Sequence, residues 1–474
     1  MAVIGARGRI HPHELLKRIP MKPAKLFWAT LLLSTAASGA DGDIDTSFGL
    51  HPATGDGFTI IHDAARSSSG RIVAAGQLNV AGVEIRRIIV MAFDTHGRPD
   101  PTFGIGGQTL IDFNNGAGGD NEPLAIAVQA DGKVLVAGDV QVAGSADTVG
   151  AIARLNVDGS PDATFGGNGK TLISFDQVTD HEFDAVQRIL PLPDGKIFLL
   201  ASSVNASGGV NIALARLAPD GTRDTTFDFD GRRVIPLPAG ITAEQGTGIA
   251  RDAANRLLIG GNSQNAAANI DMVVLRVLQN GQLDTTFGAG GRTTVAFDVA
   301  DSRADRAEQL LLQPDGKIVL VGQAVVSAGE STDFAVARIN PDGGADATFG
   351  VGGRVLVPFD LDADGVDGAF GAALQGDGKL IAVGAALRDG DASDVALARL
   401  DTTGNLDNSF GFAGKTHFSV AIRSPEQYAP AVFLQNGRPL LAIGGLGIGN
   451  SKGSNDLGVV RLQSGDLVFA DGFD

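Results

Sequence analysis

The chain has 474 residues, of which 43% are hydrophobic and 19% are charged. This composition provides ample apolar surface for a packed core and excludes a disordered chain. The chain has no cysteine, which excludes disulfides and Cys-ligated metal sites. Its formal net charge of −17 disfavours binding to nucleic acid and to anionic membranes, because both repel an acidic surface.

The first predicted element is a secretory signal peptide at residues 21–40, MKPAKLFWATLLLSTAASGA. Lys22 and Lys25 form its basic start, an apolar stretch too short to span a bilayer comfortably follows, and small residues close it. A buried N-terminal helix is the alternative. We interpret residues 1–20 as a start-site extension, with Met21 as the true first residue. The signal predicts a secreted or cell-surface protein, with the periplasm as the alternative, and no later apolar run is long enough for a transmembrane helix.

Residues 41–474 contain seven copies of one repeat and are predicted to form a single domain. Each copy holds three sequence anchors: a Phe-Gly loop, a hairpin such as LQPDGKIVLVG, and a strand such as FAVARIN. The Phe-Gly anchors recur every 55 to 62 residues, at Phe48, Phe103, Phe165, Phe227, Phe287, Phe349 and Phe410.

Each copy contains four strand candidates, and one copy shows them most clearly, at residues 292–298, 307–313, 317–323 and 333–340. Asp-Gly between the second and third candidates favours a tight type I′ hairpin turn. Helical periodicity is absent. The third strand is apolar on both faces, which indicates that neighbouring sheets cover both sides of it.

These features predict an all-β fold, namely a seven-bladed β-propeller with four antiparallel strands per blade. The alternative is an open β-solenoid, whose coils are usually shorter than ~61 residues and which needs capping units. The short distance from Phe48 to Gly70 leaves the first blade little room for a first strand of its own. We therefore expect Leu467–Phe469, or a neighbouring part of the C-terminal segment, to complete blade one.

The repeat resembles the delta-60 repeat, a bacterial β-propeller repeat of unknown function. The resemblance covers nearly everything after residue 41 and is carried best by LDTTFGAGG, LQPDGKIVLVG and FAVARINPDG. The fourth unit departs from the pattern, with Ala-Ala-Asn-Arg at 253–256 in place of Pro-Asp-Gly-Lys and Asp228 in place of Gly. The resemblance implies a propeller fold and export, and it supplies no catalytic residues.

Six of the third anchors contain an Arg, and in five units an Asp follows eight residues later. Two interpretations are open: a ring of cations that lines a ligand channel, or ion pairs that hold each loop to its blade. We favour ion pairs, because a guanidinium between packed blades needs a carboxylate. The first unit has Ala92 in place of Arg, although it keeps Asp100. The predicted pairs are Arg154–Asp162, Arg216–Asp224, Arg276–Asp284, Arg338–Asp346 and Arg399–Asp407.

The segment DLDADGVDG has the D-x-D-x-D-G spacing that places hard oxygen ligands around Ca²⁺. Asp360, Asp362 and Asp364 are candidate ligands, and Asp367 is a candidate substitute for the Glu that usually stands at position twelve. The equivalent loops at residues 175–180 and 297–305 are also acidic. An ordinary turn is the alternative, because Asp and Gly are common turn residues. The expected cofactor is therefore Ca²⁺ or none.

No enzyme motif with a defined mechanism occurs in the sequence, and no catalytic residue is assigned. We predict an exported, monomeric and non-catalytic module that binds or scaffolds a protein or a glycan through loops on one face. One alternative is a secreted propeller enzyme, such as a lactonase or a sugar dehydrogenase, with a channel site. The other is a structural protein of the cell surface.

Overall fold

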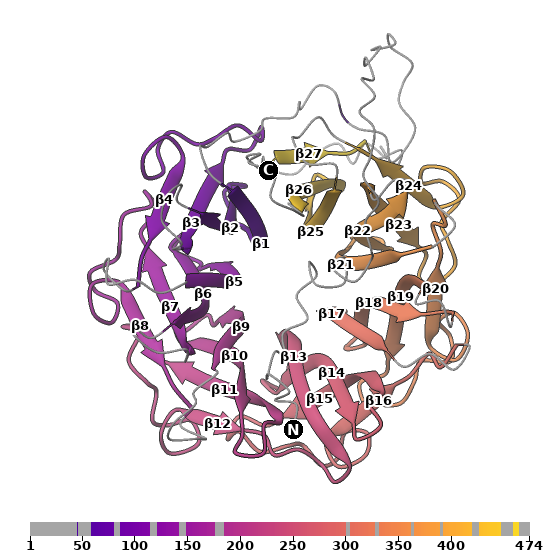
Figure 1. The fold of residues 1–474 in the computed structure, drawn as a ribbon, viewed down its shortest axis with the longest axis horizontal. Helices are drawn as coiled ribbons and strands as arrows, with labels where there is room; N and C mark the ends of the chain where they lie inside the picture. Colours follow the sequence, from indigo (N-terminus) through magenta and orange to yellow (C-terminus); the bar gives the residue numbers. More distant parts are fainter. Residues whose placement is uncertain are drawn as a thin grey trace, which may run out of the picture.

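The chain folds as a seven-bladed β-propeller in the computed structural model (Figure 1). The structure describes residues 45, 58–79, 86–113, 121–141, 148–175, 184–299, 304–327, 331–361, 365–388, 392–419, 426–446 and 458–463. Six blades have four antiparallel strands, and the seventh has three within the described ranges. The predicted fold class is therefore confirmed. None of these residues belongs to a helix that is long and apolar enough to cross a membrane.

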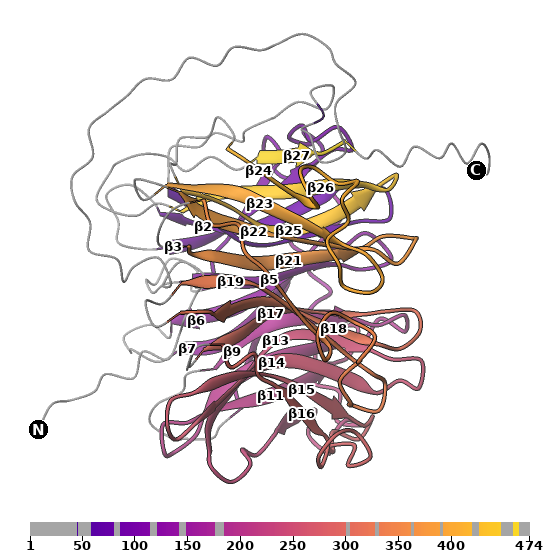
Figure 2. The same ribbon diagram turned by 90° about the vertical axis from the view of Figure 1, so that its right-hand side faces the viewer.

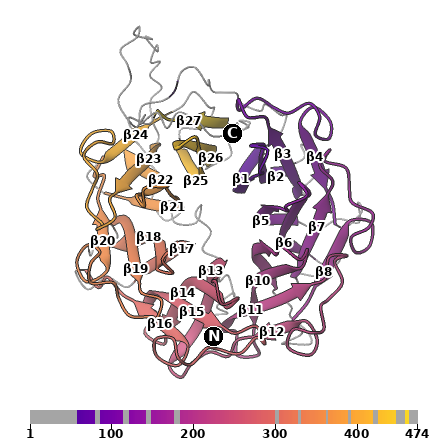
Figure 3. The ribbon, with the colours of Figure 1, turned by 180° about the vertical axis from the view of Figure 1, so that it is seen from behind.

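The strands follow one another in chain order from blade to blade. The first three blades consist of β1 (Phe58–Arg66), β2 (Ile72–Asn79), β3 (Arg86–Phe93), β4 (Gln108–Ile111); β5 (Asn121–Val128), β6 (Val134–Gln141), β7 (Thr148–Leu155), β8 (Lys170–Ile173); and β9 (Ala185–Pro191), β10 (Ile197–Val204), β11 (Val210–Leu217), β12 (Arg232–Val234). In each of these blades the first strand lies nearest the axis and the fourth lies at the outer edge (Figures 1 and 3).

The other four blades repeat this arrangement. They consist of β13 (Ile241–Arg251), β14 (Leu257–Asn265), β15 (Ile270–Val277), β16 (Arg292–Val295); β17 (Asp305–Leu312), β18 (Ile318–Val325), β19 (Thr332–Ile339), β20 (Arg354–Val357); β21 (Asp367–Leu374), β22 (Leu380–Arg388), β23 (Ala392–Leu400), β24 (Lys415–Phe418); and β25 (Glu426–Gln435), β26 (Arg438–Leu446), β27 (Gly458–Arg461). Blades 6 and 7 also share one parallel bridge, Ser393 with Glu426.

The turn that we predicted between the second and third strand candidates joins the first and second strands of each blade, and it is not of type I′. Between β17 and β18 the amide of Gly316 donates to the carbonyl of Gln313, and the amide of Gln313 donates to the carbonyl of Lys317. Of the two central residues of the predicted turn, Asp315 and Gly316, only Gly316 has a positive φ, 84°. The turn is therefore type I with a glycine bulge, because Pro314 favours the first central position of a type I turn.

The strand after each Phe-Gly loop belongs to a different blade from the one we predicted. Residues 292–298 were expected to begin their own unit, but β16 pairs with β15, with Leu275 opposite Arg292. The chain reverses through the Gly-rich loop and pairs with the strand that it has just left. The six loops from Phe103 to Phe410 thus each join the third and fourth strands of one blade.

This shift changes how the ring closes. Blade 1 obtains all four strands from residues 58–111, so the prediction that the C-terminal segment completes it was wrong; Leu467–Phe469 itself lies outside the described residues. The amide of Asp45 donates to the carbonyl of Arg461 at 2.8 Å, as the amide of Asp346 donates to that of Arg338 at 3.0 Å. Asp45 therefore makes in blade 7 the backbone contact that Asp346 makes in blade 5.

Seven hydrophobic clusters form the core, one at each junction between neighbouring blades. The cluster between blades 7 and 1 joins Ile61 and Phe93 to Leu440 and Val459. Each repeat places one face of its sheet against the preceding blade and the other against the next, which explains why the second and third strands are apolar on both sides. No blade can bury its faces alone.

The propeller has two faces. Because the strands are antiparallel, the turns between first and second strands and the loops between third and fourth strands lie at the same end of every blade (Figure 2). We call this end the turn face. The opposite face carries the connections between blades and the loops between second and third strands.

Candidate functional site

In each of the five predicted pairs, the Arg and Asp side chains form an ion pair. Arg338 Nε is 2.6 Å from Asp346 Oδ2, and the two side chains are only 6% and 4% exposed. The other four distances are 2.6 Å for Arg154–Asp162, 2.7 Å for Arg216–Asp224, 2.8 Å for Arg276–Asp284 and 2.8 Å for Arg399–Asp407. These guanidinium groups point into loops of the turn face and do not line the axis.

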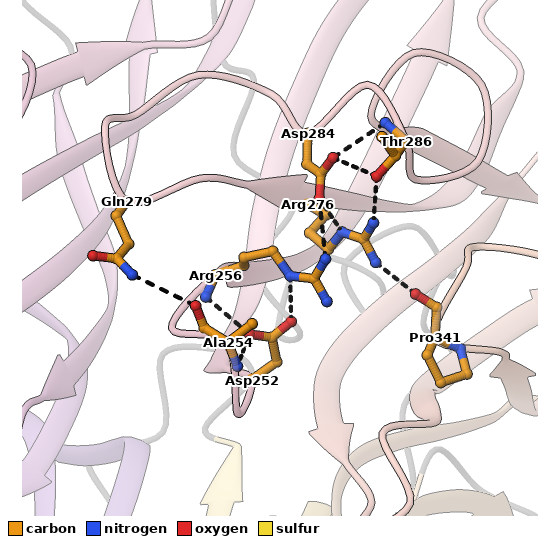
Figure 4. Close-up of polar contacts among 8 residues, drawn as sticks. All are labelled: Asp252, Ala254, Arg256, Arg276, Gln279, Asp284, Thr286 and Pro341. Carbon is orange, nitrogen blue, oxygen red and sulfur yellow. Dashed lines mark hydrogen bonds and ion pairs between the residues drawn. The ribbon is translucent and has the colours of Figure 1, made fainter.

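The pairs of Arg154, Arg276 and Arg338 are each part of a larger clamp that reaches the next blade, and Figure 4 shows that of Arg276. Arg276 Nη1 donates to the carbonyl of Pro341 in the next blade at 2.6 Å, and its guanidinium lies 4.7 Å from the ring centroid of Phe287. Arg256, from the preceding turn, places Nη1 3.3 Å from the same carboxylate, Asp284. The Arg thus joins the carboxylate, the anchor Phe and the neighbouring blade at one point.

The Asp of each clamp is held in its ionised form. Burial tends to raise the pKa of Asp346, but hydrogen bonds from Thr348 and Lys317 outweigh burial and hold the pKa well below its usual range. The pKa of Asp407 is lowered to about 2; burial opposes this shift, while hydrogen bonds from Ser409 and Lys379 produce it. The recurrent carboxylates are therefore already hydrogen-bonded to side chains of the protein.

Blade 1 makes the same clamp with a different residue. Arg71 comes from the turn, where other blades have Lys or Arg, and its Nε donates to Asp100 at 2.8 Å. Its Nη1 donates to the carbonyl of Val157 in the next blade at 2.5 Å. Arg71 therefore replaces both the turn cation and the strand Arg of the other blades, since Ala92 stands at the strand position.

A second recurrent feature is the residue after Phe-Gly in each turn-face loop. Large apolar side chains occupy this position in four blades, and they are 85% to 95% exposed: Ile105, Phe229, Val351 and Phe412. In blades 2 and 4 the position holds Gly167 and Ala289, which are also exposed. These positions were not among the residues predicted from the sequence, although their constant offset from each anchor Phe could have identified them.

Two clusters of three carboxylates lie at the opposite face, between blades 4 and 5 and between blades 5 and 6. They consist of Asp271, Asp298 and Asp305, and of Asp333, Asp360 and Asp367. Within each cluster one carboxylate oxygen of every residue lies within 4.8 Å of the others. Asp360 and Asp367 were predicted ligands, whereas Asp362 and Asp364 lie outside the described residues.

Burial dominates the electrostatics of both clusters. It raises the pKa of Asp367 to about 7; hydrogen bonds from two backbone amides work against this shift, and the charges of Asp333 and Asp360 add to it. Burial likewise raises the pKa of Asp305 to about 6. Sequence analysis missed Asp333 and Asp271, because they stand far along the chain from the acidic loop that they meet.

A third group of charged residues lies at the axis. Arg188 on β9 donates to the carbonyl of Glu308 on β17 at 3.2 Å and to that of Leu124 on β5 at 3.5 Å. Burial raises the pKa of Glu308 to about 7, and the attraction of Arg188 only partly offsets this. Burial also raises the pKa of Asp63 on β1, which Arg188 again partly offsets. No motif in the sequence indicated this group.

The repeats have a known counterpart. Five segments match the family described as "Domain of unknown function (DUF5122) beta-propeller", at residues 129–165, 192–227, 255–287, 313–349 and 375–410. Each segment runs from a hairpin turn or just before it to an anchor Phe. The match supports a propeller repeat family without a known activity. No curated protein matches the chain.

Solved structures resemble the fold only distantly. The periplasmic gluconolactonase PpgL of Pseudomonas aeruginosa has a TM-score of 0.44 and 14% identity, over 74% of this chain and 84% of its own. The polysaccharide lyase Uly1 has a TM-score of 0.47 and 11% identity, over 89% and 99%. The β-propeller domain of the Trilobed protease from Pyrococcus furiosus has a TM-score of 0.39 and 8% identity, over 88% and 99%. These likenesses carry no inference about activity.

Proposed function

We propose that this protein is an exported, non-catalytic propeller that binds another protein through its turn face. The observation that carries the proposal is the set of exposed apolar side chains at one repeat position, which are Ile105, Phe229, Val351 and Phe412. Large apolar side chains that recur at one repeat position on one face and remain open to water favour an interaction surface, since aromatic and aliphatic anchors dominate the energy of interfaces.

These side chains are not needed to form their loops. Gly167 and Ala289 occupy the same position in blades 2 and 4, where the loop is built in the same way. Phe229 even stands at a φ of 65°, in the left-handed region, which is costly for a bulky side chain. An exposed Phe in a strained conformation adds nothing to the fold, so a role in binding accounts for it better.

A protein fits this face better than a membrane or a glycan. The net charge of −17 repels anionic lipid surfaces. Two of the four side chains, Ile105 and Val351, are aliphatic and offer no flat ring to a sugar, whereas an apolar protein surface accepts both aliphatic and aromatic anchors. The four residues also stand on four different blades, so the partner has to extend across a large part of the face.

The proposal is tested with the variant Ile105→Ser/Val351→Ser/Phe412→Ser and the matched control Gly167→Ser/Ala289→Ser, which changes the same loop position in other blades. Proteins captured from the cell surface by the full chain are purified and their affinity for each variant is measured. We expect the triple variant to lose at least about tenfold in affinity and the control to keep it. Equal affinities, or light scattering that shows only self-association of the chain, would contradict the proposal.

Phe229→Asn separates binding from folding. Asn tolerates the left-handed conformation better than Phe, so we expect the melting temperature to stay constant or to rise. Affinity for the captured partner should fall at the same time. A variant that loses stability while it keeps its affinity would show that Phe229 supports the fold instead.

A second candidate function is hydrolysis at the axis, and the group Asp63, Arg188 and Glu308 favours it. A carboxyl group whose pKa lies near 7 suits general acid–base catalysis, and a guanidinium beside it suits an anionic substrate. A panel of sugar lactones and anionic glycosides is therefore assayed with wild type and Glu308→Gln. An activity that Glu308→Gln abolishes would support this candidate, and the absence of activity in wild type would remove it.

A further inference from the structure

The two carboxylate clusters occupy the same place in two successive repeats. Each takes one Asp from the third strand of a blade, one from the connection to the next blade, and one from the first strand of that next blade. Corresponding members are Asp271 and Asp333, Asp298 and Asp360, and Asp305 and Asp367. The connection residues Asp298 and Asp360 have nearly the same φ, 47° and 48°. The two junctions that flank blade 5 therefore have the same arrangement of carboxylates.

Each cluster contains a buried carboxylate oxygen that no protein group satisfies. Asp367 is fully buried and Asp305 is 2% exposed. Their Oδ2 atoms accept hydrogen bonds from the amides of Phe359 and Phe297, while both Oδ1 atoms have no hydrogen-bond partner. A buried charged oxygen without a partner is costly, and two further carboxylates close by increase that cost by repulsion.

Two equivalent acids at other junctions, Glu244 and Asp394, form ion pairs with side chains of the protein. Glu244, which corresponds to Asp305, forms an ion pair with Arg292 at 3.3 Å. Asp394, which corresponds to Asp333, lies 2.9 Å from His417 and 3.1 Å from Arg388. The six Asp residues of the two clusters form no ion pair with a Lys, Arg or His side chain within the described part of the chain. Burial raises the pKa of Asp333 to about 6 and the attraction of Lys415 only partly offsets this, so a further positive charge would stabilise the cluster.

We propose that each cluster binds one Ca²⁺ ion, so that the protein holds two ions, one on either side of blade 5. Three carboxylates supply hard oxygen ligands and no nitrogen or sulfur, which suits Ca²⁺ and not Zn²⁺. Ligands from two blades and a connecting loop provide the adaptable geometry that Ca²⁺ accepts and that Mg²⁺ accepts poorly. The ion satisfies the buried Oδ1 atom and joins two blades at the face opposite the clamps.

This ligand set differs from the one that the D-x-D-x-D-G spacing predicts. In that pattern all ligands come from a single loop, whereas here Asp333 lies on the preceding blade. The cluster between blades 4 and 5 has no D-x-D-x-D-G run, yet it contains the corresponding three residues. The inference therefore rests on the blade junction and is independent of the proposed binding at the turn face.

The test is calorimetric titration of the full, chelator-treated chain with CaCl₂ at pH 7.5. We expect two ions per chain, with dissociation constants of roughly 10⁻⁴–10⁻³ M, the range of extracellular calcium modules. Asp298→Asn and Asp360→Asn change exposed members of the clusters, so folding should tolerate both substitutions. Each single variant should bind one ion fewer than wild type, and the double variant should bind none. Asp394→Asn is the matched control and should leave two.

Three outcomes would overturn the proposal. Wild type that takes up no Ca²⁺ at millimolar concentration would show that protons, not metal ions, neutralise the clusters. Two ions bound by Asp298→Asn and by Asp360→Asn would place them elsewhere. Equal or tighter binding of MgCl₂ in the same titration would refute the assignment to Ca²⁺.

Discussion

Arg338 and Asp346 show how a repeat uses its most regular polar residues. The guanidinium contacts the carboxylate, stacks 4.3 Å from the ring centroid of Phe349, and donates to the carbonyl of Thr402 in the next blade at 2.8 Å. Such a residue has no capacity left for a ligand. Polar residues that recur in every blade are therefore poor candidates for a binding site in this protein.

We predict that Arg338→Ala and Asp346→Ala each lower the free energy of unfolding by about 3–5 kcal/mol, because each removes the closest ionic partner of a buried charge. The double variant should lose less than the sum of the two, by about 0.5–3 kcal/mol. Urea unfolding followed by circular dichroism measures all three values. Strictly additive losses would mean that the two side chains do not stabilise each other.

Glu308 gives a prediction for pH. Its pKa is raised to about 7 in the folded protein, so folding favours the protonated form. In the unfolded chain the carboxyl has the ordinary pKa of about 4.3. The stability that the protonated form provides is therefore lost as the pH rises from about 4.3 through 7. Glu308→Gln cannot ionise. We therefore expect it to melt at a higher temperature than wild type at pH 8 and at nearly the same temperature at pH 4.5. A variant that is less stable at pH 8 would show that attraction to Arg188 outweighs burial.

At the scale of single elements, the bulge in six of the seven first strands lies opposite a glycine in the second strand, whereas blade 3 has Ala201 there. In β17 the register shifts between Ala307 and Gln309, which leaves Glu308 as the extra residue. Gly322 lies opposite, and a Cβ there would be 1.9 Å from the carbonyl oxygen of Arg306. In β18 this position is a glycine because the bulged strand β17 approaches it too closely for a side chain.

We predict that Gly322→Ala lowers the free energy of unfolding by about 1–3 kcal/mol through this overpacking. Gly376→Ala is the matched control, since a Cβ at Gly376 meets nothing within 4 Å. It should be neutral or slightly stabilising. Thermal unfolding of both variants checks the prediction, and equal melting temperatures would contradict it.

The same elements show what could be predicted from the sequence. Alternating and doubly apolar runs indicated the strands, and an Asp eight residues after each Arg indicated a contact, because both signals are local. The blade boundary was misplaced by one strand, since a repeat looks the same wherever it is cut. Asp271 and Asp333 were missed because their clusters form only when two blades meet, and no spacing in the chain records that contact.

For the whole molecule, ring closure depends on Asp45. Its Oδ2 accepts from Arg438 and Arg461, at 2.9 Å and 3.0 Å, and so reproduces in blade 7 the clamp of the other blades. The cluster of apolar side chains between blades 7 and 1 completes the circle. Every blade therefore has two neighbours, unlike the terminal units of an open array.

We predict that Asp45→Ala lowers the midpoint of the whole unfolding transition, because opening one junction of a ring weakens both adjoining blades. The loss should resemble that of Asp346→Ala, the matching residue inside the ring. Hydrogen exchange should show faster exchange in blades 1 and 7 than elsewhere. An unchanged midpoint would mean that Asp45 is only loosely attached to a ring that is stable without it.

The contact between Asp45 and Arg461 can form only late in the synthesis of the chain. The two residues are 416 positions apart, so one leaves the ribosome early and the other only after nearly all the intervening chain has been translated. A product truncated before Arg461 would expose strand edges and apolar surface that invite aggregation and degradation. A copy that contains Arg461 can bury these surfaces, because the contact between Asp45 and Arg461 then joins blade 7 to the start of the ring.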